Sequence, residues 1–207
     1  MDVQAKDYIR EYLLRSVDSL NALAADSVNQ EIMEKMAIVI ADAMQRGGKL
    51  LIAGNGGSAG DSQHIAGEFL SRLMYDRPAL PAIALTVDTS VITAIGNDYS
   101  FETIFERQIM ALGRPGDVFL AISTSGSSKN ILRGLEAARH QGLTTLGFSG
   151  QAISPMHSMC DHVLAVPSRD TPIIQQMHIV AAHIICALVE RDRFPRQPTQ
   201  DRECLLV

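Results

Sequence analysis

A histidine and a glutamate four residues apart, His64 and Glu68, are side chains that can transfer protons or bind a metal ion. They follow a glycine-rich turn, and the segment between that turn and Glu68 is predicted to be helical. Residues four apart on a helix share one face and lie about one turn from each other. The sequence therefore predicts an acid/base or metal-binding pair close to the turn.

A second group of chemically capable side chains lies in the last predicted helix, residues 171–191, within a strongly apolar segment. It comprises two amides and two imidazoles: Gln175, Gln176, His178 and His183. Together with the first pair, His183 would complete a His, Glu, His set, which is an acceptable ligand set for zinc. Helical periodicity places Gln176 closer than Gln175 to the face of His183. A core position is the alternative for each histidine.

Two turns are suited to bind an anion. The glycine turn, GNGGS at residues 54–58, lets an anion approach backbone N–H groups at the start of a helix that Ser58 is expected to cap. The serine turn, STSGSS at residues 123–128, presents hydroxyl and N–H groups toward one point. A cap alone needs only one or two of these hydroxyls. The serine turn therefore predicts a phosphate monoester as ligand.

A dinucleotide site is the competing interpretation of the glycine turn, because Gly54, Gly56 and Ala59 match the spacing G-x-G-x-x-G/A. That motif requires an acidic residue about 20 positions further on, at the end of the second strand. Asp76 has this spacing but lies in a predicted turn, and Asp88 follows the second strand at too great a distance. We therefore favour a sugar phosphate over a dinucleotide.

The elements that must position these residues alternate between strand and helix from residue 50 onward. The predicted strands are short apolar runs, typical of strands buried on both faces of a parallel sheet, at residues 50–53, 82–85, 118–122, 144–148 and 163–166. Helices are predicted at residues 58–74, 89–95, 101–112, 129–140 and 171–191. Right-handed connections give an α/β fold, a five-stranded parallel sheet flanked by helices, of the flavodoxin or Rossmann type. Both turns follow strands, at the edge where such sheets bind ligands.

Two amphipathic helices are predicted before the first strand, at residues 3–26 and 32–44, because their apolar residues recur at steps of three and four. This N-terminal helical extension, residues 1–46, is expected to pack in an oligomer interface. Residues 1–194 are predicted to form a single domain. The polar, proline-containing segment 195–207 is expected to be a mobile tail.

Composition excludes several classes of partner. A net charge of -5 and a pI near 5.6 argue against a nucleic-acid or anionic membrane surface. Uninterrupted apolar runs stay below the roughly 18 residues of a membrane span, and the N-terminal segment is too charged for a signal peptide. The three cysteines, Cys160, Cys186 and Cys204, lack a paired motif and indicate reduced thiols. We expect a cytoplasmic protein without nucleic-acid or membrane partners.

Four ordered motifs carry a resemblance to a known family: GNGGSAGDSQHIAGEF, AIGNDYSFETIF, ISTSGSS and DTPIIQQMHIVAAHIICALVE. From its first helix to about Phe194, the chain resembles the phosphoheptose isomerases, which have the sugar isomerase (SIS) fold. The resemblance implies a homotetramer that converts sedoheptulose 7-phosphate to D-glycero-D-manno-heptose 7-phosphate, an early step toward nucleotide-activated heptose and lipopolysaccharide. Ile173 stands where many members carry a basic residue.

The resemblance also implies the site residues. One Zn2+ per subunit would be held by His64, Glu68, Gln175 and His183. The substrate would contact both turns and both helices, at Asn55, Gly56, Gly57, Ser58, Glu68, Asn97, Asp98, Ser123, Thr124, Ser125, Ser128 and Gln175. Moving a carbonyl from C2 to C1 of a sugar passes through an enediol or enediolate, which requires a base and an acid. We assign the base to Glu68 and the acid to His183.

Two other kinds of protein share this fold. One is a non-catalytic tetramer that regulates the bacterial replication initiator, and the other is a sugar-phosphate-sensing module fused to a DNA-binding domain. His64, Glu68 and His183 favour the enzyme, because a pure binding protein has no need of them. The sensing module is disfavoured because the chain has no room for a DNA-binding domain.

Overall fold

The computed structural model describes residues 3–196, which form one parallel sheet with strand order β2-β1-β3-β4-β5. The strands are β1 (Leu50–Gly54), β2 (Ala82–Ala84), β3 (Val118–Ile122), β4 (Thr144–Gly150) and β5 (His162–Val166). The predicted α/β fold and five-stranded parallel sheet are confirmed, and each strand was predicted to within two residues at either end. Part of the predicted tail, residues 197–207, lies outside the described residues, as does Cys204.

The helices are α1 (Val3–Ala25), α2 (Ser27–Gln45), α3 (Gly57–Leu70), α4 (Thr89–Asp98), α5 (Ile104–Leu112), α6 (Lys129–His140), α7 (Met156–Met159) and α8 (Thr171–Arg193), with a 3-10 turn, Phe101–Thr103, before α5. Four predictions need correction. Helix α2 begins five residues earlier than predicted, where the Asp26 carboxylate caps it. Helix α3 ends four residues earlier than predicted, because the Arg77 guanidinium takes the carbonyls of its last turn. Helix α4 continues through Gly96, since one glycine costs only about 1 kcal/mol. Helix α7 was not predicted.

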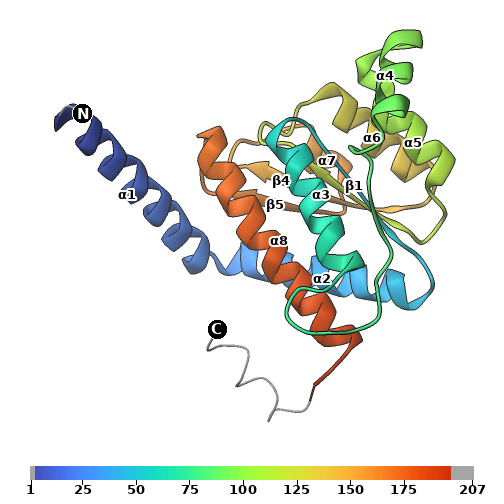
Figure 1. Cartoon of the computed structure of the whole chain (residues 1–207), viewed down its shortest axis with the longest axis horizontal. Helices are drawn as coiled ribbons and strands as arrows, with labels where there is room; N and C mark the ends of the chain where they lie inside the picture. The colour runs from blue at the N-terminus through green and yellow to red at the C-terminus, as the bar shows by residue number, and fades with distance from the viewer. Residues whose placement is uncertain (1–2, 197–207) are drawn as a thin grey trace.

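The sheet separates two hydrophobic cores, because successive strand residues point to opposite faces. In β1, Leu50 and Ile52 join the core under α2, α3 and α8, whereas Leu51 and Ala53 join the core under α5 and α6. Figure 1 shows α3 and α8 side by side, with α5 and α6 in another part of the molecule. The metal-binding candidates and the serine turn are therefore supported by different cores.

Helix α8 is long and apolar enough to cross a membrane by length and composition, with a mean hydropathy of 1.6 over its most apolar window. Half of that window is buried inside the protein, where Met177, Ala181, Ile185 and Val189 enter the first core. Helix α8 packs against α2 and α3. Its apolar composition is accounted for by its place in the core, and the expected absence of a membrane partner stays a prediction.

The predicted N-terminal helical extension, residues 1–46, divides into two parts: α1 projects away from the sheet (Figure 1), whereas α2 packs into the first core. Helix α1 is attached to α8 in part by Arg15, whose Nη1 lies 3.4 Å from Asp170 Oδ2. Large apolar side chains along α1 are more than half exposed: Tyr8, Ile9, Leu13, Leu14 and Val17. The helix thus carries an apolar surface that the described part of the chain does not cover.

Candidate active site

A cleft of about 310 Å³ lies where the chain leaves β1 and β3. These strands are neighbours, and the strand order reverses at this point, which is where open parallel sheets form a crevice. The cleft is lined by both turns and by the start of α8, through Asn55, Gly56, Gly57, Ser58, Ile122, Ser123, Thr124, Ser128, Thr171 and Gln175. Seven of the predicted substrate-binding positions in the turns, and Gln175, therefore share one cavity with two residues that were not predicted.

The glycine turn begins α3, and the expected capping role of Ser58 is wrong. The N-cap is Gly56, whose φ of 56° is open to glycine and unfavourable for other residues. Ser58 lies inside the helix and is buried. A side chain at Gly57 would run into the amide of Gln175. Glycine at this position therefore allows α8 to approach the turn closely.

The serine turn gathers its hydroxyls by hydrogen bonds among themselves. Ser123 Oγ lies 3.1 Å from Ser128 Oγ and 3.4 Å from Ser125 Oγ, and it accepts the backbone N–H of Gly126 at 3.1 Å. Ser128 precedes α6 as its N-cap, without a side-chain capping bond to the described residues. Helix capping therefore does not account for the run of serines, and the turn is available for an anion at the N-terminus of α6.

A reciprocal amide pair, absent from the predicted site, joins the two turns. Asn55 Nδ2 donates to Asn130 Oδ1 at 2.9 Å, and Asn130 Nδ2 donates to Asn55 Oδ1 at 2.8 Å. Asn130 belongs to the first turn of α6 and is buried. A polar residue two positions after the serine turn was the sequence signal for it. The pair fixes the distance between the glycine turn and the start of α6.

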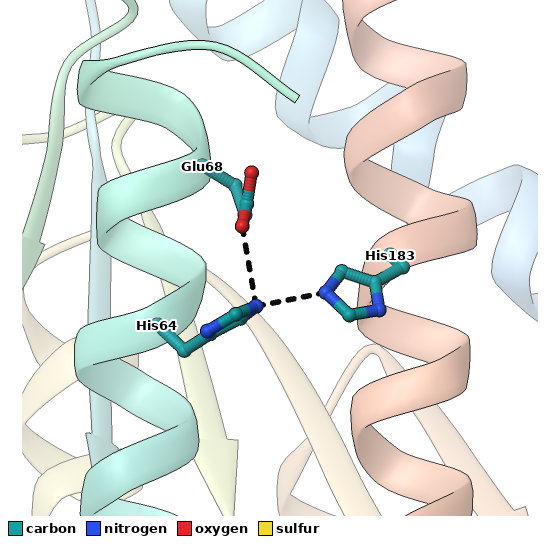
Figure 2. Close-up of side chains that lie close together, drawn as sticks. All are labelled: His64, Glu68 and His183. Carbon is teal, nitrogen blue, oxygen red and sulfur yellow. Dashed lines mark hydrogen bonds and ion pairs between the residues drawn. The ribbon is translucent and has the colours of Figure 1, made fainter. Parts of the chain in front are cut away.

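The His/Glu/His group, defined here as His64, Glu68 and His183, assembles between α3 and α8 (Figure 2). His64 Nε2 lies 2.8 Å from His183 Nε2 and 3.2 Å from Glu68 Oε1. One ligand atom of each residue lies within 4.8 Å of the others. Two imidazole nitrogens and a carboxylate oxygen that converge in this way are a suitable donor set for a metal ion such as zinc.

The two glutamines of α8 point to different neighbours. Gln175 lies against Gly57 in the cleft, whereas Gln176 Nε2 is 3.5 Å from the hydroxyl of Tyr12 in α1. Helical phase alone had favoured Gln176 for the site. Gln175 lies eight residues before His183, which is roughly 12 Å along the helix axis. Its contribution as a fourth metal ligand stays a prediction.

Comparisons with known proteins identify the family. The sequence model of the SIS domain matches residues 11–150. A phosphoheptose isomerase of Aneurinibacillus thermoaerophilus is 49% identical over 188 residues, covering 91% of this chain and 95% of the relative. The chain belongs to the phosphoheptose isomerase family of SIS-domain proteins. The predicted family is confirmed, and with it the enzyme class, an aldose–ketose isomerase.

Other similarities support membership of the phosphoheptose isomerase family. A phosphoheptose isomerase of Burkholderia pseudomallei is 48% identical, covering 95% of this chain and all of the relative. The solved structure of a phosphoheptose isomerase from Francisella tularensis has a TM-score of 0.87 and 34% identity, covering 90% of this chain and 98% of that chain. The Vibrio vulnificus NanR protein, with 16% identity and a TM-score of 0.62, shares only the fold.

Burial shifts the pKa of three groups on α3 and α8. Desolvation raises the pKa of Asp61, which lies one turn before His64, while the nearby imidazole lowers it. Burial raises the pKa of the Cys186 thiol to about 12, with a smaller contribution from the charge of Glu68. Burial lowers the pKa of His178 to about 4, and its ring hydrogen bonds the carbonyl of Ser149. His178 is therefore a neutral core histidine, the alternative that had been left open.

Four predicted substrate contacts do not line the cleft: Glu68, which belongs to the His/Glu/His group, Ser125, which lies within the serine turn, Asn97 and Asp98. Asn97 and Asp98 are exposed at the C-terminal end of α4, where the Asn97 amide donates to the Asp98 carboxylate at 2.8 Å. Among residues 3–196, those that line the cleft do not include either of them. Their contact with substrate stays a prediction.

Proposed function

We propose that the chain converts sedoheptulose 7-phosphate to D-glycero-D-manno-heptose 7-phosphate through an enediol or enediolate. The observation that carries the proposal is the His/Glu/His group on α3 and α8, the two helices whose first residues line the cleft beside the serine turn. In α3, His64 lies seven residues after Gly57, roughly 10 Å along the axis. Proton transfer and anion binding would thus be separated, as expected for a sugar with its carbonyl and phosphate at opposite ends.

Glu68 is proposed to remove the proton from the carbon next to the carbonyl, and His183 to protonate and deprotonate the sugar oxygens. A carboxylate has two oxygens, so one can face His64 while the other acts as base. The residues that would hold Zn2+ are His64, Glu68, Gln175 and His183. When bound, the ion would polarise the carbonyl and reduce the energetic cost of negative charge on the enediolate.

The serine turn is proposed to bind the phosphate, with Ser123, Thr124, Ser125 and Ser128 as donors around the N-terminus of α6. A phosphate distant from the reacting carbons supplies binding energy that orients them. The glycine turn, with Asn55, Gly56, Gly57 and Ser58, is proposed to contact the sugar chain. Glycine at position 57 supports this role, because it lets the amide of Gln175, another proposed substrate contact, lie against the turn.

The proposal includes a cytoplasmic homotetramer that supplies heptose for nucleotide-activated heptose and lipopolysaccharide, without nucleic-acid or membrane partners. Residues 1–194 would form one domain, and residues 1–46 would pack against other subunits. The exposed apolar face of α1 supports subunit packing, because contiguous apolar patches of this kind mark protein interfaces. The net charge of -5 supports the absence of a nucleic-acid partner, because binding to nucleic acid requires a basic surface.

The direct test is incubation of the purified protein with sedoheptulose 7-phosphate, followed by identification of the aldose formed. We expect product with the metal-loaded protein, a loss of rate of at least about 100-fold after chelation, and recovery on addition of Zn2+. No product under any of these conditions would contradict the proposal. Capture of a replication initiator together with absent turnover would favour the non-catalytic relative.

A further inference from the structure

A fully buried ion pair connects the segment after α3 to the end of α8. Arg77 Nε lies 3.0 Å from Glu190 Oε1, and the two side chains are 2% and 1% exposed. The carboxylate also accepts the backbone N–H groups of Leu73 at 3.1 Å and Met74 at 2.8 Å. A buried charge is tolerated when its hydrogen bonds are satisfied, and breaking such a pair leaves an uncompensated charge. Removing either partner is therefore expected to weaken the connection between the two segments strongly.

The other end of the Arg77 guanidinium binds α3 itself. Nη2 donates to the carbonyl of Glu68 at 2.7 Å, and Nη1 donates to the carbonyl of Phe69 at 2.6 Å. These carbonyls belong to the last turn of the helix, where intrahelical donors run out and the helix dipole favours a cation. Arg77 thus links the backbone of a proposed metal ligand to the carboxylate of Glu190.

Glu190 lies on the same face of α8 as His183, because seven residues are nearly two full helical turns. The Arg77–Glu190 pair therefore joins α3 at Glu68 to the face of α8 that carries His183. Figure 2 shows that the His/Glu/His group spans the space between these two helices. The spacing of its ligand atoms depends on how far apart the helices are held.

We propose that Arg77 and Glu190 are positioning residues that hold α3 and α8 at the separation required for His64, Glu68 and His183 to bind one metal ion. The inference rests on the metal-dependent function proposed above. Metal sites tolerate deviations of only about 0.2 Å in ligand distance, and loss of supporting hydrogen bonds typically weakens metal affinity by 10- to 100-fold. Neither residue was predicted from the sequence to belong to the site.

A second buried carboxylate in the chain provides a matched control. Asp117 accepts the backbone N–H groups of Lys49 and Arg114, each at 2.9 Å, and it pairs with the Lys49 ammonium. Its side chain is 3% exposed. Asp117 immediately precedes β3, at the amino ends of the strands, whereas the site lies at their carboxyl ends. Its loss should destabilise the protein without moving α3 relative to α8.

The experiment compares Co2+ binding by metal-free wild-type protein and by the variants Glu190→Gln, Arg77→Lys and Asp117→Asn, all at a temperature where circular dichroism shows them folded. We expect the Co2+ Kd to rise about 10- to 100-fold in Glu190→Gln, and the Co2+ absorption spectrum to change because the ligand geometry changes. Arg77→Lys keeps the positive charge but loses the planar guanidinium, so we expect the Co2+ Kd to rise about tenfold. The Co2+ Kd of Asp117→Asn should stay within about twofold of the wild-type value, even if its Tm falls as much as that of Glu190→Gln.

Wild-type affinity and an unchanged spectrum in folded Glu190→Gln, or an equal loss of affinity in Asp117→Asn, would overturn the positioning role. Should Glu190→Gln fail to fold, the comparison of Arg77→Lys with Asp117→Asn decides by the same criteria. A wild-type protein that binds no Co2+ would overturn the metal site itself. Co2+ binding without turnover of sedoheptulose 7-phosphate would contradict the proposed function but leave the positioning result standing.

Discussion

The serine turn consists of one continuous segment, residues 123–128, whereas the His/Glu/His group joins residues 119 positions apart. In the serine turn, hydroxyl and backbone groups within the segment bind one another. In the His/Glu/His group, each helix contributes only part of the donor set, and the gap between the helices determines whether the set is complete. Local backbone conformation thus controls the first region, and helix packing controls the second.

This difference predicts two kinds of functional loss. Changes in the His/Glu/His group should lower kcat, because these side chains are proposed to act on the reacting carbons. Changes in the serine turn should mainly raise KM, because the proposed phosphate contact is made in the ground state as well as in the transition state. The following predictions test this division, beginning with the largest expected effect.

Replacing Glu68 with glutamine should lower kcat by roughly 10²- to 10⁴-fold, because an amide cannot accept the substrate proton. Tm should change little, since the replacement has nearly the same shape. KM should change less than kcat, with excess Zn2+ in the assay because Glu68 is also a proposed metal ligand and substrate contact. Steady-state kinetics with sedoheptulose 7-phosphate, together with thermal unfolding, would measure these quantities. A kcat within tenfold of wild type would break the division, because Glu68 would then not be the base.

Replacing Gly126 with alanine should raise KM by roughly tenfold with a smaller change in kcat, because a positive φ costs a non-glycine residue about 1–2 kcal/mol. The residue has a φ of 62°, and an added methyl group would collide with Ser154 Oγ. Gly47→Ala is the matched control, with a φ of 83° and open space within the described residues. An equal rise in KM in both variants would show that strain, not the serine turn, is responsible.

Replacing Asn130 with aspartate should raise KM by several-fold, because one donor of the reciprocal amide pair is lost and a hydrogen bond of this kind contributes roughly 1 kcal/mol. The substitution weakens the link between the glycine turn and the serine turn and leaves the His/Glu/His group unaltered. We expect kcat to stay within about threefold, since the proposed catalytic side chains are unaltered. A drop in kcat with unchanged KM, in the same kinetic assay, would contradict the division.

The smallest effect on turnover is expected for His178→Asn, because His178 lies on α8 but faces the core. Its pKa falls from an ordinary 6.5 to about 4 in the folded protein, so the unfolded chain binds the extra proton as pH drops through this window. The wild-type protein should therefore lose stability between pH 6.5 and pH 4, by an amount on the order of 3 kcal/mol, and level off below pH 4.

The His178→Asn variant should lack this component, and its kcat at neutral pH should stay within twofold of wild type. Urea unfolding at several pH values would measure the difference between the two proteins, which cancels the titration of other groups. Equal pH dependence in both proteins would show that the burial of His178 does not control its protonation.

The sequence predicted the sheet and both turns because their signals are local. Short apolar runs and glycine clusters specify strands and turns within a few residues. The grouping of His183 with His64 and Glu68 was also predicted, but only from ligand chemistry and the family resemblance. Helix phase favoured Gln176 over Gln175, and the approach of Gln175 to Gly57 depends on how α8 packs against the glycine turn.

The predictions failed where a distant residue decides the outcome. The end of α3 is set by Arg77, and the link between the turns is set by Asn130. Ser58 was a reasonable capping residue by type, but the positive φ required at the N-cap selects Gly56. Side-chain hydrogen bonds such as those of Arg77 and Asn130 leave no periodic pattern in the sequence.

The sheet that separates the two cores also divides the molecule into two units of local opening. Helices α3 and α8 share one core with α2, whereas α6, which follows the serine turn, shares the other with α5. Partial unfolding proceeds in contiguous cooperative units, so amide hydrogen exchange should group α3 with α8 and α5 with α6. A metal ion would then slow exchange in the first unit and inorganic phosphate in the second, so that each half of the active site reports its own ligand.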